Sequence, residues 1–237
     1  MDKNITKARA YFYEFLAYPL FFHTSDEKFA RWREQLSYLA QNPLSEQSAE
    51  AFANLEKFSF KELVNEQNEV LFGFTNIPLS ASFYEEGRDN GAARLRVIHC
   101  LNLSPYRRDK ELCKDSEDYV GFIFLAMATF LNDEFNDAKN ISDKLFNETL
   151  NLFVDEFGSL LLAHKNANFF RSYALILKDF IELERAVLSV EAPAKPQGDS
   201  VAMAALKKEP FQSKMPTIKT KLHWEEFSPV ISHEFKD

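Results

Sequence analysis

Apolar residues recur at helical spacing along most of the first 190 residues. Ile5, Ala8, Phe12 and Phe15 share one face of a 3.6-residue repeat, which predicts a helix over about 4–17. The same spacing predicts helices from about residue 24 to the break at Asn42-Pro43, after Ser45, and over about 59–72, 92–103, 141–157 and 168–190.

The stretch 115–131 differs from the others. Four polar residues, three of them acidic, precede an almost wholly apolar run of more than three helical turns. A helix that is apolar on nearly every side packs on nearly every side, so we expect the central helix of an all-α domain here. Asp115 or Ser116 is its expected N-cap, and Glu117 and Asp118 suit the positive end of the helix.

Two segments lack this periodicity. Residues 73–91 form a long expected loop that ends at Asn90-Gly91, and two prolines and a glycine between 191 and 198 mark a linker. The predicted fold class is therefore all-α: a single-domain helical bundle of about eight or nine helices over 1–190, with an irregular 73–91 loop. Residues 191–237 are expected to be a linker and a partly irregular C-terminal tail.

Composition narrows the function classes. Six glycines leave no Gly-rich phosphate loop, and a net charge of −8 disfavours nucleic acid and anionic membranes as partners. Acidity of this size suits a cationic partner, or serves solubility alone. No run of about 18 apolar residues and no signal-peptide core occur, so a cytoplasmic protein without stable membrane insertion is expected.

Candidate chemistry points to binding rather than catalysis. His99, Cys100 and Cys113 lack a zinc spacing, and no nucleophile motif occurs, so neither a metal nor an enzyme is expected. The acids of Glu117-Asp118-Tyr119 are explained by helix capping alone, or they receive a cationic peptide in bidentate fashion. The aromatic residues of 71–84 complete the core, or they form one wall of a groove.

Three separated segments form a recognisable pattern when their order and spacing are considered together. They are Leu71-Phe72-Gly73, the Pro-Leu-Ser-Ala-Ser-Phe-Tyr stretch at 78–84, and Glu117-Asp118-Tyr119 with Met127 downstream. Together they resemble the TorD/DmsD family of cytoplasmic redox-enzyme maturation chaperones. That pattern has a Leu-Phe pair, a Pro-x-Ser-x-x-Tyr-like stretch, and Glu-Asp-His on a central helix.

The resemblance covers about 1–190, because 8–17 and 169–183 are also similar to the family's first and last long helices. The chain departs from the pattern at Tyr119, where the family usually has His. It also lacks the usual Gly-Pro pair after Phe72 and carries a longer tail.

The resemblance implies a non-catalytic chaperone without a cofactor of its own. Its partners would be the twin-arginine signal peptide and the apo form of a molybdopterin (or tungstopterin) enzyme's catalytic subunit. A formate dehydrogenase is favoured as client over a DMSO/TMAO-type reductase. A monomer or a domain-swapped dimer is compatible with such a chain. The expected peptide-binding residues are Glu117 and Asp118 as arginine partners, with Phe72, Pro78, Ser80, Tyr84 and Tyr119 lining the groove.

Other interpretations stay open. Glu117 and Asp118 also suit a nucleotide-binding or nucleotide-hydrolysing accessory protein that uses them as a base or as Mg²⁺ ligands. A helix-binding adaptor with no signal-peptide role is a third class. In the tail, the segment 206–211 (Leu-Lys-Lys-Glu-Pro-Phe) loosely resembles a twin-arginine core. This suggests that 199–237 occupies the groove when no client is present.

Overall fold

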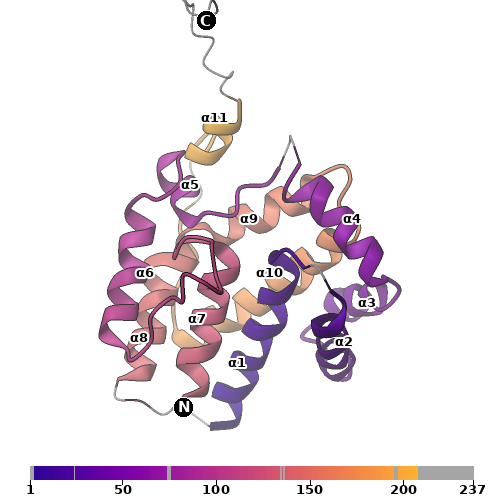
Figure 1. Ribbon diagram of the computed structural model, residues 1–237, viewed down its shortest axis with the longest axis horizontal. Helices are drawn as coiled ribbons and strands as arrows, with labels where there is room; N and C mark the ends of the chain where they lie inside the picture. The colour runs from indigo at the N-terminus through magenta and orange to yellow at the C-terminus, as the bar shows by residue number, and fades with distance from the viewer. Residues whose placement is uncertain are drawn as a thin grey trace, which may run out of the picture. The chain divides into compact units, whose positions relative to one another are not determined.

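Helices account for most of the chain in the computed structural model, which describes residues 3–23, 25–73, 76–133, 135, 137–194 and 197–207 (Figure 1). The all-α prediction is confirmed. A 3-10 turn, Tyr18–Leu20, follows the first helix, and a π-helical turn, Phe146–Leu150, joins the eighth to the ninth. The α-helices are α1 (Lys3–Ala17), α2 (Glu27–Leu39), α3 (Glu46–Leu55), α4 (Phe60–Val70), α5 (Ala81–Glu86), α6 (Ala92–Leu103), α7 (Val120–Asn132), α8 (Ala138–Leu145), α9 (Asn151–Ala163), α10 (Phe169–Leu188) and α11 (Val201–Lys207).

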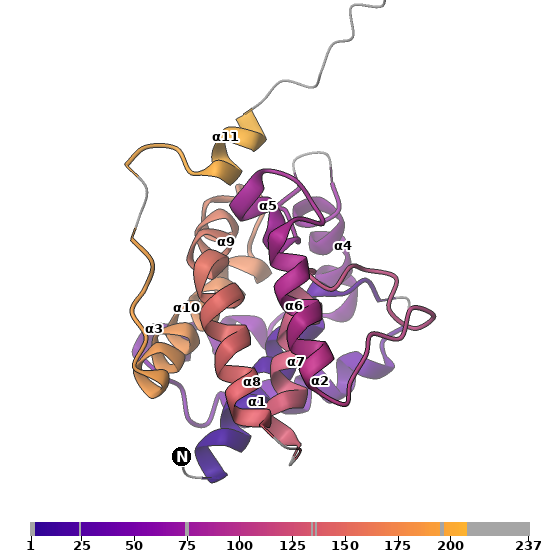
Figure 2. The same ribbon diagram turned by 90° about the vertical axis from the view of Figure 1, so that its left-hand side faces the viewer.

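Helix α7 is the central helix that the sequence predicts. Nine of its 13 residues are buried, and it lies between α1 and α8 (Figure 1). Gly121 permits its close approach to the chain after α1, because a Cβ there would lie 3.0 Å from the rings of Phe21 and Tyr119. Seen from the side, α6 and α8 lie on the near face (Figure 2).

Short polar motifs set two helix starts. The Ser45 hydroxyl accepts from the backbone N–H of Ser48 and begins α3. Ser59 and Glu62 cap each other reciprocally at the start of α4, with the Glu62 carboxylate 2.8 Å from the backbone nitrogen of Ser59. These reciprocal contacts satisfy N–H groups that a helix start leaves without partners.

Three sequence predictions need correction. Helix α7 begins at Val120 rather than near Asp115, so the acids precede the helix and provide no N-cap. The 73–91 segment is not wholly irregular, because it contains α5. The helix expected over 141–157 begins at Ala138 and is interrupted by the π-helical turn, whose buried Phe146 and Leu150 keep the apolar pattern running through the irregularity.

Part of the predicted tail is also helical. Helix α11 lies within it and buries Ala202. Of the twin-arginine-like segment 206–211, the first two residues end α11, and 208–211 lie outside the described residues. In the described part of the chain, none of the helices has the length and apolar character needed to cross a membrane.

A buried ion pair joins the first and last long helices. The Glu184 carboxylate of α10 accepts from Arg9 Nε at 2.5 Å, from Arg9 Nη2 at 2.9 Å and from the Tyr13 hydroxyl at 2.8 Å. The Arg9 and Glu184 side chains are 1% and 0% exposed. Removing one partner of a buried ion pair is strongly destabilising, because the remaining buried charge loses its strongest contact.

We therefore expect Glu184→Gln to lower the free energy of unfolding by about 3 kcal/mol. Urea denaturation of the whole protein measures this change. Glu182→Gln is the matched control on the same helix. Its carboxylate is 61% exposed and lies 4.0 Å from Lys178, so a change below about 0.5 kcal/mol is expected. Equal effects of the two substitutions would contradict a structural role for Glu184.

Candidate functional site

A backbone junction joins the segment before α5 to the start of α7. The Ala81 N–H donates to the Asp118 carbonyl at 2.8 Å, and the Val120 N–H donates to the Leu79 carbonyl at 2.8 Å. Ser80 and Tyr119 thereby form an isolated antiparallel bridge. Tyr119 is extended, with φ −63° and ψ 129°, which explains why α7 begins one residue later.

Asp118 lies beneath this junction and is fully buried. Its carboxylate accepts hydrogen bonds from the hydroxyls of Ser80, at 2.7 Å, Ser82 and Ser116. Burial alone raises the pKa of Asp118, but the three hydroxyl donors outweigh it and hold the pKa below its ordinary value. Asp118 therefore fixes the junction and faces no open space.

Glu117 is buried next to it and is shared by two arginines. Arg94 Nε donates to Oε2 at 2.7 Å, and Arg108 Nε donates to Oε1 at 2.8 Å. Burial raises the pKa of Glu117, and the hydrogen bonds from the two guanidinium groups reverse this, so that the pKa is lowered overall. The predicted arginine partner thus binds arginines of its own chain.

The predicted groove-lining residues divide into two groups. The Tyr119 hydroxyl donates to the Leu20 carbonyl, and burial raises its pKa, so Tyr119 stays neutral. Tyr84 is buried and donates to the Pro78 carbonyl at 2.8 Å, which directs both residues inward. Phe72 stands apart at the end of α4.

Phe72 is 41% exposed, and its ring makes an edge-on contact with Phe22, itself 59% exposed, at a centroid distance of 6.1 Å. Phe21, which directly precedes Phe22, packs against the Tyr119 ring at a centroid distance of 5.4 Å. Aromatic residues therefore lead from Tyr119 to an exposed pair at the surface.

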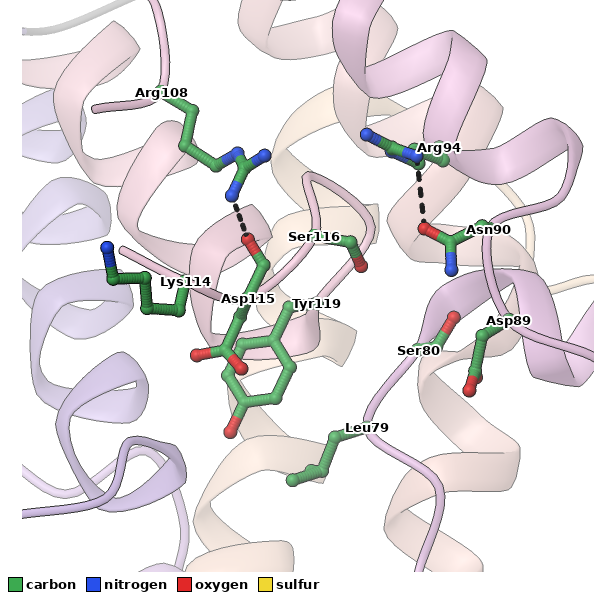
Figure 3. A pocket seen from close by; sticks show the side chains of 10 residues that line it. All are labelled: Leu79, Ser80, Asp89, Asn90, Arg94, Arg108, Lys114, Asp115, Ser116 and Tyr119. Carbon is green, nitrogen blue, oxygen red and sulfur yellow. Dashed lines mark hydrogen bonds between the residues drawn. The ribbon is translucent and has the colours of Figure 1, made fainter. Parts of the chain in front are cut away.

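A polar pocket of about 460 Å³ opens over the junction. Of the predicted site residues, only Ser80 and Tyr119 line it (Figure 3). Its other lining residues are Leu79, Asp89, Asn90, Arg94, Arg108, Lys114, Asp115 and Ser116. Sequence reasoning missed these, although the charged connection at 107–111 and the Asn90-Gly91 turn were visible signals beside them.

The turn between α5 and α6 positions one rim of this pocket. Gly87 and Asn90 both have left-handed backbones, with φ of 68° and 60°. The Glu86 carboxylate accepts from the backbone N–H of Ala92 at the start of α6, and a Cβ on Gly91 would lie 2.3 Å from that carboxylate. Glycine at 91 therefore permits the cap that places Asp89 and Asn90 at the rim.

The charges around the pocket are mixed. Asp89 and Asp115 are exposed, and their carboxylates form no hydrogen bond or ion pair with other described residues. They are thus the carboxylates of the lining that remain available to a cationic group. Among the described residues, no cluster of His, Cys, Asp and Glu could hold a metal ion, and Cys100 and Cys113 are both free thiols.

Comparison with known proteins adds no identification: neither the models of known families nor the curated proteins match this chain.

The burial of Asp118 generates a pH-dependent prediction. Asp118→Asn presents one acceptor oxygen instead of two to the three hydroxyls, so we expect a loss of about 1–3 kcal/mol in the free energy of unfolding at pH 7. Because the pKa of Asp118 is lowered by folding, its stabilisation is complete above the unfolded pKa of about 4. It is lost as the pH falls through the lower folded value.

Denaturant titrations from neutral to acidic pH measure this difference. The gap between the native protein and Asp118→Asn should stay constant down to about pH 5 and narrow below about pH 4. Asp89→Asn, which changes an exposed carboxylate, is the control and should leave stability nearly unchanged. A gap that persists at every acidic pH at which both proteins fold would contradict the ionised state of Asp118.

Proposed function

We propose that this protein is a cytoplasmic, non-catalytic maturation chaperone of the TorD/DmsD type. It binds the twin-arginine signal peptide and the apo catalytic subunit of a molybdopterin or tungstopterin oxidoreductase. The client is a formate dehydrogenase or a DMSO/TMAO-type reductase. The chaperone holds this subunit while its cofactor is inserted, before export.

The observation that carries the proposal is the junction between 79–81 and 118–120. Two of the segments on which the resemblance rests are 38 residues apart in sequence (Ser80 and Asp118) and share a hydrogen bond of 2.7 Å. Their meeting point forms the floor of the polar pocket. If the segments of the family pattern build one binding site, they are expected to lie next to each other in the fold, as these two do.

The surroundings of the pocket suit a peptide that consists of an arginine pair followed by a hydrophobic stretch. Asp89 and Asp115 offer carboxylates to a cationic pair, and a carboxylate accepts a guanidinium group through two parallel hydrogen bonds. The Tyr119–Phe21 contact leads from the pocket toward the exposed Phe22–Phe72 pair. Exposed aromatic rings give apolar contact to the hydrophobic stretch that follows the arginines of such a signal.

This assignment moves the arginine contact away from Glu117 and Asp118. Asp118 is fully buried beneath three serine hydroxyls, and Glu117 is 7% exposed and bound by Arg94 and Arg108. A peptide arginine would have to displace these partners, whereas Asp89 and Asp115 accept one without rearrangement. Glu117 and Asp118 then support the pocket from below.

Isothermal titration calorimetry with a synthetic twin-arginine signal peptide tests the proposal. We expect binding that weakens about tenfold or more when both peptide arginines are replaced by alanine, since tenfold corresponds to about 1.4 kcal/mol. The double variant Asp89→Asn/Asp115→Asn should weaken binding to a similar degree, and it should be nearly insensitive to the arginine replacement.

Asp133→Asn is the matched control, because it neutralises an exposed carboxylate at the end of α7 outside the pocket lining. It should leave the affinity unchanged. Binding that ignores both the arginine replacement and the pocket variants would refute the site. Absence of binding to any twin-arginine peptide would refute the function and favour a helix-binding adaptor.

A further inference from the structure

The two arginines that share Glu117 are held on more than one side. Arg94 Nη1 donates to the Asn90 side-chain oxygen at 3.1 Å, in addition to the Nε contact with Glu117. Arg108 Nη1 donates to the carbonyls of Cys113, at 3.0 Å, and Asp115, at 2.6 Å. Both guanidinium groups are therefore fixed in position before any ligand arrives.

Each arginine nevertheless keeps an unused donor group. Neither Arg94 Nη2 nor Arg108 Nη2 forms a hydrogen bond within the described part of the chain. The Arg108 side chain is only 10% exposed, and that of Arg94 is 33% exposed. Neither Nη2 group belongs to the buried polar atoms that lack a partner, so both are accessible from solvent and an incoming acceptor can reach them.

Neighbouring groups add donors to the same wall. Because the Asn90 oxygen accepts from Arg94, its amide nitrogen lies on the side away from Arg94 (Figure 3). Lys114 also lines the pocket, but its Nζ lies 3.3 Å from the Glu111 carboxylate and its side chain is 74% exposed, so it adds little to this wall. The two guanidinium groups exceed the single Glu117 carboxylate by one positive charge, while Asp89 and Asp115 lie elsewhere on the same lining. The donors beside Glu117 therefore suit an anion with several acceptor oxygens.

We propose that Arg94 and Arg108 form an oxyanion subsite in the pocket, which binds a carboxylate or phosphate group. The free Nη2 group of each arginine can donate to an oxygen of either anion, and hydrogen bonds from a charged donor to an anion are stronger than neutral ones. Preorganisation by Glu117, Asn90 and the two carbonyls reduces the entropy lost on binding. The subsite goes beyond the signal-peptide proposal and does not depend on it, since a small free oxyanion already suffices to occupy it.

Neutralising a carboxylate at the rim of the pocket should have opposite effects on binding of an oxyanion and on binding of the cationic peptide. The Asp115 carboxylate lines the same pocket, and its own carbonyl binds Arg108. Neutralising it removes repulsion of an anion and attraction for a cation. Asp115→Asn should therefore tighten oxyanion binding while it weakens binding of the arginine peptide.

The proposal is tested by NMR, which follows the chemical shifts of the arginine side-chain Nε–H groups. Inorganic phosphate and, in a separate titration, acetate are added at constant ionic strength. We expect saturable shifts of the Arg94 and Arg108 resonances at millimolar probe. Phosphate binding more tightly than acetate identifies a phosphate-bearing ligand. Equal affinities identify a carboxylate, such as an acidic side chain of a partner.

Arg94→Gln is the main variant, because Glu117 keeps Arg108 as its partner and the fold is retained. It should weaken probe binding at least tenfold, as followed at Arg108. Arg31→Gln is the matched control. It removes a guanidinium that is 72% exposed and paired with Glu14 outside the pocket, and it should change nothing.

Shifts that rise linearly without saturation, or that are equal in all variants, would overturn the subsite. Tighter binding of the arginine peptide by Arg94→Gln, without loss of phosphate binding, would also overturn it. That result would mean that the role of Arg94 is to occupy the Glu117 carboxylate and keep a peptide arginine from binding to it. Failure of the peptide titrations alone leaves the phosphate result standing, so the two proposals fail separately.

Discussion

The fully buried carboxylate of Asp118 is the contact on which the site depends. Three serine hydroxyls from both sides of the junction converge on it, and two backbone hydrogen bonds flank it. A charge without solvent needs such donors, because hydration cannot stabilise it. The segment before α5 and the segment before α7 are therefore held together by one anion, and the pocket above them has a rigid floor.

Glu117, one residue earlier in the chain, also joins separate segments through its carboxylate. It brings together Arg94 from α6 and Arg108 from the connection that follows α6. Without this carboxylate, the two guanidinium groups would repel each other across the pocket. Both adjacent acids therefore have structural roles, and Glu117 positions Arg94, Arg108 and, through Arg108, the backbone of Asp115.

The fold class and several helix ends follow from local sequence. The capping serines Ser45 and Ser59 and the apolar spacing of α10 act over a few residues, so the sequence predicts these elements well. The start of α7 was not predictable in this way. Its preceding residues use their backbone groups to bind 79–81, and a partner so distant in sequence leaves no local pattern.

The same limit applies to the site. The acids of 117–118 were identified, but their burial depends on arginines that only the tertiary structure brings to them. Capping and peptide binding both place these acids near solvent, whereas Glu117 is 7% exposed and Asp118 0%, and neither caps α7. The π-helical turn between α8 and α9 was also hidden, since no glycine or proline marks it.

Tyr119 gives the junction a further constraint. Its hydroxyl reaches the carbonyl of Leu20 in the turn after α1, across the close contact at Gly121. A shorter ring at 119 would leave that carbonyl without this donor, and a side chain at 121 would push the ring away. Positions 119 and 121 therefore constrain each other: the Leu20 carbonyl keeps its donor only if residue 119 carries a ring that reaches it and residue 121 leaves room for that ring.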